Sequence, residues 1–180
     1  MKLFLTSLAE KVLDKIVTEL PRKQSELKVV FIPTAADTYK EKPWLEADRA
    51  KLVELGFQVE DFDLKNKTEN ENEVRETLSK VDIIFVAGGN TFYLLEKARK
   101  SGFDKVSREL AQIERVDLRG PSEKVYIGSS AGSIIAGPNI EPVKDFDDPT
   151  IADLDSYEGI GLVDFVVLPH WGREKYAARA

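Results

Sequence analysis

Short apolar runs of strand length alternate with longer amphipathic stretches along this chain of 180 residues. This alternation is typical of βα units, in which helices cover both faces of a parallel sheet. We therefore expect an α/β fold with a mostly parallel sheet and helices on both of its faces. The predicted strands are Lys2–Leu5, Leu27–Ile32, Phe57–Phe62, Asp82–Val86, Lys124–Ile127 and Phe165–Leu168. The predicted helices are Glu10–Leu20, Pro43–Leu55, Glu71–Lys80, Thr91–Arg99 and Phe103–Arg115.

The composition is that of one globular domain, residues 1–180, with 42% hydrophobic residues and a formal charge of −6. The sequence has no basic cluster of the kind that binds nucleic acid. Its longest apolar run, Ile83–Ala87, is far shorter than the roughly 20 residues that span a bilayer. Glu10 and Lys11 come too early for a signal peptide. We expect a soluble, cytoplasmic protein, a monomer or homodimer, that acts on a small substrate without nucleic acid or membrane.

The sequence contains no cysteine and one histidine, His170. Thiol nucleophiles, disulfides and Cys-ligated metals are therefore excluded, and zinc sites that need two or three imidazoles are excluded as well. We predict neither a metal nor a cofactor.

The most informative segment is Gly128–Gly132, where a β-rich run enters the motif Gly-x-Ser-x-Gly. This motif is typical of a nucleophile elbow, a strained strand-to-helix turn that projects its central serine above the sheet. The central position of the motif is Ser130, not Ser129, and the glycines two positions away on either side relieve crowding of the backbone. The helix that begins at Ala131 directs amide N–H groups towards negative charge developing on a substrate. We therefore predict a serine nucleophile with an oxyanion site.

A second glycine turn, Gly88-Gly89-Asn90, follows the strand Asp82–Val86 and opens a helix that Asn90 is expected to cap. Ligands in open α/β sheets bind at the carboxyl ends of the strands. We therefore expect the two glycine turns to bound one crevice, with the N–H groups of Gly89 and Ala131 facing each other across it.

His170 follows the last predicted strand, so we expect its imidazole at the same edge, where it serves as the general base. The acidic stretch Glu141–Glu158 lies between Ser130 and His170 and offers the third member of a triad in the chain order Ser, acid, His. Sequence spacing leaves five candidates open, which are Asp145, Asp147, Asp148, Asp153 and Asp155. We interpret the stretch as a charged surface excursion, with a lid over the site as the alternative.

Four sequence blocks together resemble the peptidase E family of serine dipeptidases, which cleave dipeptides that have an N-terminal aspartate. The blocks are Gly88–Phe92, Tyr126–Gly132, Ala136–Pro138 with Ile140, and Pro169–His170. Their order and approximate spacing make the combination far more specific than any single block. The resemblance implies a fold similar to class I glutamine amidotransferase domains, with serine in place of cysteine.

The resemblance also implies roles for individual residues. Ser130 matches the nucleophile, His170 matches the base, and Asp145 matches the aspartate of the charge relay. Gly89 and Ala131 match the oxyanion donors.

Arg173 looks like the arginine with which the family holds the β-carboxylate of its substrate, although the loop before it is shorter here. Related enzymes continue with further strands beyond the point where this chain stops, at Ala180. Some of them supply a glutamate there as the partner of the histidine. This difference leaves either Asp145 as the partner or an incomplete triad.

We therefore predict a cofactor-free serine dipeptidase that hydrolyses Asp-Xaa dipeptides through an acyl-enzyme on Ser130. The nearest alternative is a relative that hydrolyses other aspartyl linkages, such as the β-aspartyl-arginine units of cyanophycin. The alternative from a different class is a truncated, catalytically silent binding domain that keeps the crevice.

Overall fold

A computed structural model of the chain describes residues 1–112, 116–117, 120–121 and 124–170. Within these residues, a five-stranded sheet has the order β1-β7-β4-β2-β3, and every pairing in it is parallel. Its strands are β1 (Lys2–Thr6), β2 (Lys28–Ile32), β3 (Gln58–Asp61), β4 (Ile83–Val86) and β7 (Val125–Ser129). A separate antiparallel pair consists of β5 (Val116–Asp117) and β6 (Gly120–Pro121). The predicted α/β fold is confirmed.

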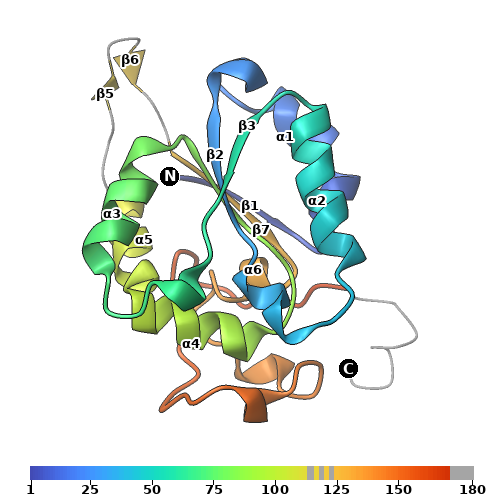
Figure 1. Ribbon diagram of the computed structural model, residues 1–180, viewed down its shortest axis with the longest axis vertical. Helices are drawn as coiled ribbons and strands as arrows, with labels where there is room; N and C mark the ends of the chain where they lie inside the picture. The colour runs from blue at the N-terminus through green and yellow to red at the C-terminus, as the bar shows by residue number, and fades with distance from the viewer. Residues whose placement is uncertain (113–115, 118–119, 122–123, 171–180) are drawn as a thin grey trace.

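Helices cover both faces of the sheet, with α1 and α2 on one side and α3 and α5 on the other (Figure 1). The helices are α1 (Leu13–Thr18), α2 (Pro43–Glu54), α3 (Glu71–Lys80), α4 (Thr91–Ser101), α5 (Phe103–Gln112) and α6 (Ala131–Ile134). Alternate strand residues enter two apolar cores. Phe31 and Phe85 stack at 5.1 Å in the core that includes residues of α1 and α2. Ile84 and Tyr126 belong to the core of α3, α4 and α5.

The predicted strand Phe165–Leu168 is wrong, because the segment has no regular structure and Phe165 is 56% exposed. Its apolar residues favour a strand by composition, but a strand also needs a neighbour to pair with. The residues just before the segment are hydrogen-bonded to a different part of the chain. The N–H groups of Leu162 and Val163 donate to the carbonyl of Ala136, at 2.8 and 3.2 Å, which ties this part of the chain to the loop after α6.

The predicted helix Glu10–Leu20 is shorter than expected and is divided into a 3-10 turn, Ala9–Lys11, and α1. The other predicted helices are present with small differences at their ends, and residues 113–115 of the last one lie outside the described part of the chain. The acidic excursion contains two 3-10 turns, Glu141–Val143 and Pro149–Ile151.

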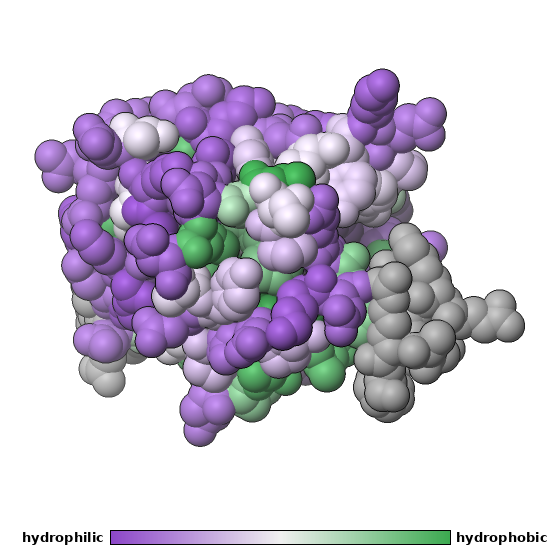
Figure 2. Space-filling model, turned by 90° about the horizontal axis from the view of Figure 1, so that it is seen from below, coloured by the Kyte–Doolittle hydropathy of each residue, from purple (hydrophilic) through white to green (hydrophobic). Residues whose placement is uncertain are grey.

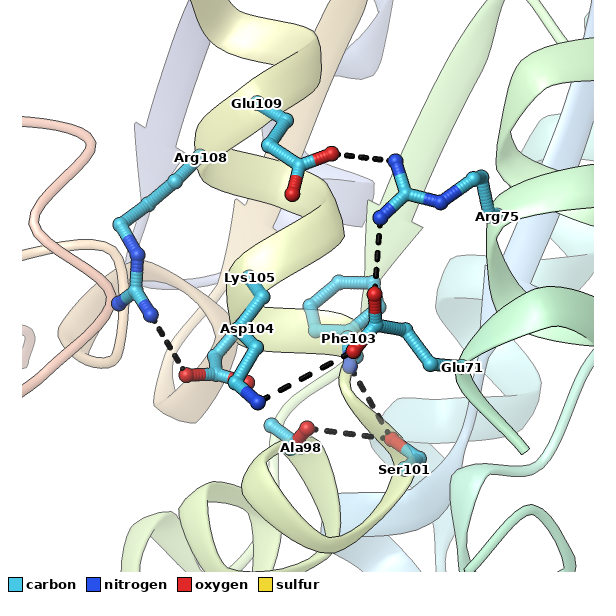
Figure 3. Close-up of polar contacts among 9 residues, drawn as sticks. All are labelled: Glu71, Arg75, Ala98, Ser101, Phe103, Asp104, Lys105, Arg108 and Glu109. Carbon is cyan, nitrogen blue, oxygen red and sulfur yellow. Dashed lines mark hydrogen bonds and ion pairs between the residues drawn. The ribbon is translucent and has the colours of Figure 1, made fainter. Parts of the chain in front are cut away.

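Charged side chains join α3 to α5 (Figure 3). Arg75 donates to Glu71 on its own helix at 2.8 Å and also to Glu109 on α5. Arg108 and Asp104 form a further pair within α5 at 2.8 Å. The pairs of Arg75 are exposed, and such pairs contribute only about 0–1 kcal/mol each, so we assign them to helix packing and to no binding site.

The carboxyl edge of the sheet collects the loops that carry the candidate residues. The connections after β2 and β4 leave in opposite directions. The next strand of the five-stranded sheet after β2 is β3, on one side of the β2–β4 pair, and the next one after β4 is β7, on the other side. Open α/β sheets bind ligands at such a point. Seen from this end, the surface is mostly hydrophilic with several separate hydrophobic patches (Figure 2). None of the helices within the described ranges is long and apolar enough to cross a membrane.

Candidate active site

The turn at Gly128–Gly132 has the geometry of a nucleophile elbow. β7 ends at Ser129 and α6 begins at Ala131, so Ser130 alone forms the turn. Its φ of 48° and ψ of −107° lie in a region that residues other than glycine rarely adopt. Backbone hydrogen bonds hold this conformation: the Ser130 N–H donates to Thr6 at 2.9 Å, and the Ser130 carbonyl accepts from Ile134 at 3.0 Å.

The two glycines of the motif are required by close contacts between strand and helix. A Cβ atom at Gly132 would lie 2.1 Å from the carbonyl oxygen of Val86, on the neighbouring strand β4. A Cβ atom at Gly128 would lie 2.6 Å from the amide nitrogen of Ser133. The predicted crowding on both sides of Ser130 is confirmed.

The structure brings Ser130 and His170 together. The Oγ atom of Ser130 lies 3.0 Å from Nε2 of His170. The backbone N–H of His170 donates to Oγ of Ser7 at 3.1 Å, so the residue that follows β1 holds the backbone of His170 beside the elbow. A neutral imidazole with an unprotonated Nε2 accepts the proton of the hydroxyl in this geometry, which is the first requirement for activating a serine.

Ser130 and His170 line a small cavity of about 40 Å³, and Asp147 is the acidic residue in its lining. The carboxylate of Asp147 accepts from the N–H and the hydroxyl of Thr91, at 2.8 and 2.5 Å. Asp145 is exposed and does not line this cavity. Among the open sequence candidates, Asp147 therefore shares a cavity with the serine and the histidine, whereas Asp145 is exposed.

His170 also borders a wider, open groove of about 670 Å³ along β1. Apolar residues dominate its lining together with Ser7 and Lys11. The groove offers room beside the imidazole that the small cavity lacks.

The second glycine turn lies against the elbow, as the sequence predicts. A Cβ atom at Gly88 would lie 3.1 Å from Cβ of Ser130. Gly89 has a φ of 154°, and a Cβ atom there would lie 2.0 Å from the carbonyl oxygen of Ala35, so this position accepts only glycine. Among the described residues, neither the Gly89 N–H nor the Ala131 N–H has a hydrogen-bond acceptor. Both amides are therefore available to a ligand in the crevice.

Asn90 joins this turn to α4 and to the acidic excursion. Its Oδ1 accepts from the N–H of Tyr93 at 2.9 Å, which confirms the predicted helix cap. Its Nδ2 donates to the carbonyl of Asp148 at 3.0 Å. Together with the contact between Asp147 and Thr91, this bond holds the excursion against the beginning of α4.

A buried carboxyl group lies next to Ser129, the last residue of β7. Asp48, on α2, is 1% exposed and accepts from the N–H of Glu10 at 2.9 Å. Burial raises the pKa of Asp48 to about 7, the hydrogen bonds from Ser129 and from the Glu10 N–H oppose this rise, and the Glu10 carboxylate adds to it. Sequence reasoning missed Asp48, because nothing in the local pattern of α2 distinguishes it from a solvated helix residue.

Arg173 lies outside the described residues, so its role stays a prediction. The described ranges contain no group of three or more His, Asp and Glu side chains that could hold a metal ion.

A serine hydroxyl and an imidazole in this relation are the arrangement that serine hydrolases share on unrelated folds, and they place the chain in that class. Comparison with known proteins narrows the class. The model of peptidase family S51 matches residues 3–180. The chain belongs to peptidase family S51.

Relatives agree with this assignment. An uncharacterized peptidase of Listeria innocua is 37% identical over 94% of this chain and 76% of that protein. Peptidase E of Shigella flexneri is 30% identical over 90% of this chain and 62% of that protein. The crystal structure of a candidate peptidase E protein from Listeria monocytogenes EGD-e has a TM-score of 0.85 and 36% identity, and the match covers 99% of this chain and 83% of that one.

These matches confirm the resemblance to peptidase E and the enzyme class, a serine peptidase. The parallel sheet and its structural neighbour are also consistent with the predicted glutamine amidotransferase-like fold.

Proposed function

We propose that this peptidase hydrolyses dipeptides with an N-terminal aspartate through an acyl-enzyme on Ser130. The observation that carries the proposal is the 3.0 Å contact between Oγ of Ser130 and Nε2 of His170 at a strained strand-to-helix turn. Oγ attacks the scissile carbonyl while Nε2 accepts its proton. The imidazolium then returns the proton to the leaving amine, and water hydrolyses the ester by the same route.

The N–H groups of Gly89 and Ala131 are the proposed donors to the tetrahedral oxyanion. Their turns adjoin, since a Cβ atom at Gly88 would lie 3.1 Å from Cβ of Ser130, and neither amide is bonded to another described residue. Removing one such donor from an enzyme costs about 10²–10³ in kcat, so the position of these two amides has a large effect on the rate.

The acidic member of the triad has two candidates. The resemblance indicates Asp145, whereas the lining of the cavity favours Asp147, which shares it with Ser130 and His170. A half-buried carboxylate near the imidazole orients it and stabilises its charged form better than an exposed one, which solvent screens. We therefore favour Asp147.

Selectivity for aspartate requires a cation for the β-carboxylate of the substrate, because the protein as a whole carries a formal charge of −6. A guanidinium binds a carboxylate through two parallel hydrogen bonds, which an ammonium does not reproduce. Arg173 is the proposed cation, on the strength of the resemblance.

Hydrolysis of Asp-Leu, Glu-Leu and Ala-Leu by the wild-type protein and by Ser130→Ala tests the proposal. We expect turnover of Asp-Leu alone, and its loss in the variant. Intact-mass analysis after treatment with a fluorophosphonate adds a direct test, with one adduct on the wild type and none on Ser130→Ala. Hydrolysis of β-Asp-Arg in place of Asp-Leu would support the cyanophycin-type alternative. A folded wild type with neither turnover nor adduct would support the silent domain.

A further inference from the structure

The indole of Trp44 contacts the glycine turn that carries one of the proposed oxyanion donors. Its Nε1 donates to the carbonyl oxygen of Gly88 at 3.1 Å. Trp44 stands in the first turn of α2, directly after Pro43, and its ring is half-buried. The contact therefore links α2, on one face of the sheet, to the crevice at its carboxyl edge.

The bonded carbonyl and the proposed donor belong to the same peptide group. The peptide between Gly88 and Gly89 is trans, so its C=O and its N–H point in opposite directions. A hydrogen bond that holds the carbonyl of Gly88 towards Trp44 therefore directs the N–H of Gly89 away from Trp44. Rotation of this peptide plane, to which glycine offers little resistance, would move the N–H out of position.

The rest of the turn is fixed from the other side. The N–H of Asn90 donates to the carbonyl of Ala35 at 2.8 Å, and Gly89 packs directly against the same carbonyl. These contacts hold the end of the turn, whereas the bond from Trp44 holds its first peptide. Trp44 is itself supported by Tyr39, whose ring meets it edge-on at 5.2 Å.

We infer that Trp44 is a positioning residue that orients the Gly89 N–H towards the oxyanion formed on Ser130. This inference rests on the proposed function, because it assigns a role within the same reaction. Trp44 is not required to touch the substrate. Its effect passes through one peptide group, so it changes the stability of the tetrahedral state and has little effect on the binding of an intact dipeptide.

Two variants remove the indole N–H. Trp44→Phe keeps an aromatic ring, and replacement of Trp44 by benzothienylalanine keeps the size and shape of the bicyclic ring while sulfur takes the place of the N–H. We expect kcat for Asp-Leu to fall about 10-fold in both, which is less than the loss of a whole donor, with KM nearly unchanged. Val53→Ala, at an exposed position of α2, is the matched control for the helix and is expected to keep wild-type kinetics.

Inhibition by the aldehyde analogue of aspartate separates positioning from a purely structural role. Oγ of Ser130 adds to the aldehyde carbon as its proton passes to Nε2 of His170, and the electron pair of the C=O π bond moves to the carbonyl oxygen, which becomes the oxyanion. We expect both Trp44 variants to bind this inhibitor about 10-fold more weakly while their melting temperatures stay close to that of Val53→Ala. Wild-type affinity for the aldehyde and wild-type kcat in the benzothienylalanine protein would overturn the inference.

The rate of labelling by a fluorophosphonate tests the role of Trp44 independently of the proposed substrate. A fluorophosphonate forms an Oγ–P bond with Ser130 as fluoride leaves, and its phosphoryl oxygen occupies the same oxyanion site. If the wild type reacts with the reagent but does not hydrolyse Asp-Leu, the proposed specificity fails, and the labelling rate still decides on Trp44. We expect a slower rate in both Trp44 variants, and an unchanged rate would contradict the role. Absence of labelling in the wild type would end both proposals.

Discussion

Oγ of Ser130 lies 3.0 Å from Nε2 of His170, although 40 positions separate the two residues in the chain. The sheet brings them together. Ser130 follows β7, and His170 is held by its backbone bond to Ser7, which follows β1. Because β1 and β7 pair in parallel, with Thr6 opposite Ser129, their carboxyl ends lie side by side. The strand order therefore explains how the backbone of His170 comes to lie beside Ser130.

Replacing His170 by Ala is expected to lower kcat/KM for Asp-Leu by about 100-fold or more, since general base catalysis contributes 10²–10⁴ in other enzymes. The chain has no second histidine to take over the role. Steady-state kinetics measures the loss, and imidazole added to the buffer should restore part of the activity. Ser7→Ala, which removes only the bond to the backbone of His170, should reduce activity several-fold. Full activity of His170→Ala would contradict the proposed base.

Gly132→Ala is expected to destabilise the fold strongly, because its Cβ would lie 2.1 Å from the carbonyl oxygen of Val86. Overpacking typically costs about 1–3 kcal/mol and occasionally more, and we expect this site at the upper end because the neighbour is backbone. Gly56→Ala is the control: its φ is 89°, but a Cβ atom there meets nothing within 4 Å, so only conformational strain of about 1–2 kcal/mol applies. Urea denaturation compares the free energies of unfolding, and equal losses in the two variants would refute close packing of the elbow against β4.

Features that depend on local chemistry could be predicted from the sequence. The buried strand β4 is a continuous apolar run, as a parallel strand covered on both faces must be. The elbow is recognisable because its crowded turn tolerates only glycine at positions 128 and 132. Asn90 caps α4 with its own side chain, within three residues.

Features that depend on distant partners could not be predicted. Phe165–Leu168 has the composition of a strand, but backbone bonds from Leu162 and Val163 to Ala136 direct the preceding chain to the loop after α6. Trp44 lies on a helix whose sequence does not indicate that it faces the turn after β4. Contacts between parts of the chain that are far apart in the sequence decide both cases, and the local pattern of residues gives no sign of such contacts.

Asp147→Ala and Asp145→Ala form a matched pair only two residues apart. Asp147 lines the cavity of Ser130 and His170 and accepts two hydrogen bonds from Thr91, so its loss should lower kcat more than about 10-fold and the free energy of unfolding by about 1–2 kcal/mol. Asp145 is exposed, and its replacement should change stability by less than about 0.5 kcal/mol and leave kcat near the wild-type value. Kinetics with Asp-Leu and thermal unfolding decide between them. The reverse pattern would identify Asp145 as the partner of the histidine.

The buried carboxyl of Asp48 is expected to make stability depend on pH. Burial raises its pKa from 3.8 to about 7 in the folded protein, so between these values the folded state binds a proton that the unfolded state has released. The contribution of the protonated carboxyl to stability is therefore complete below about pH 4 and declines as the pH rises to about 7, by about 1.4 kcal/mol per unit.

Asp48→Asn removes this titration, because the amide has no charge to desolvate and still offers an oxygen to the N–H of Glu10, which donates at 2.9 Å in the wild type. We expect the two proteins to have similar free energies of unfolding near pH 4. The variant should be more stable at pH 8, and the difference in free energy of unfolding should increase as the pH rises between these values. Urea denaturation at unit steps of pH measures the two curves, and their difference isolates Asp48 from the other carboxyl groups. Parallel curves would show that Asp48 is ionised in the folded protein throughout this range, which its nearly complete burial argues against.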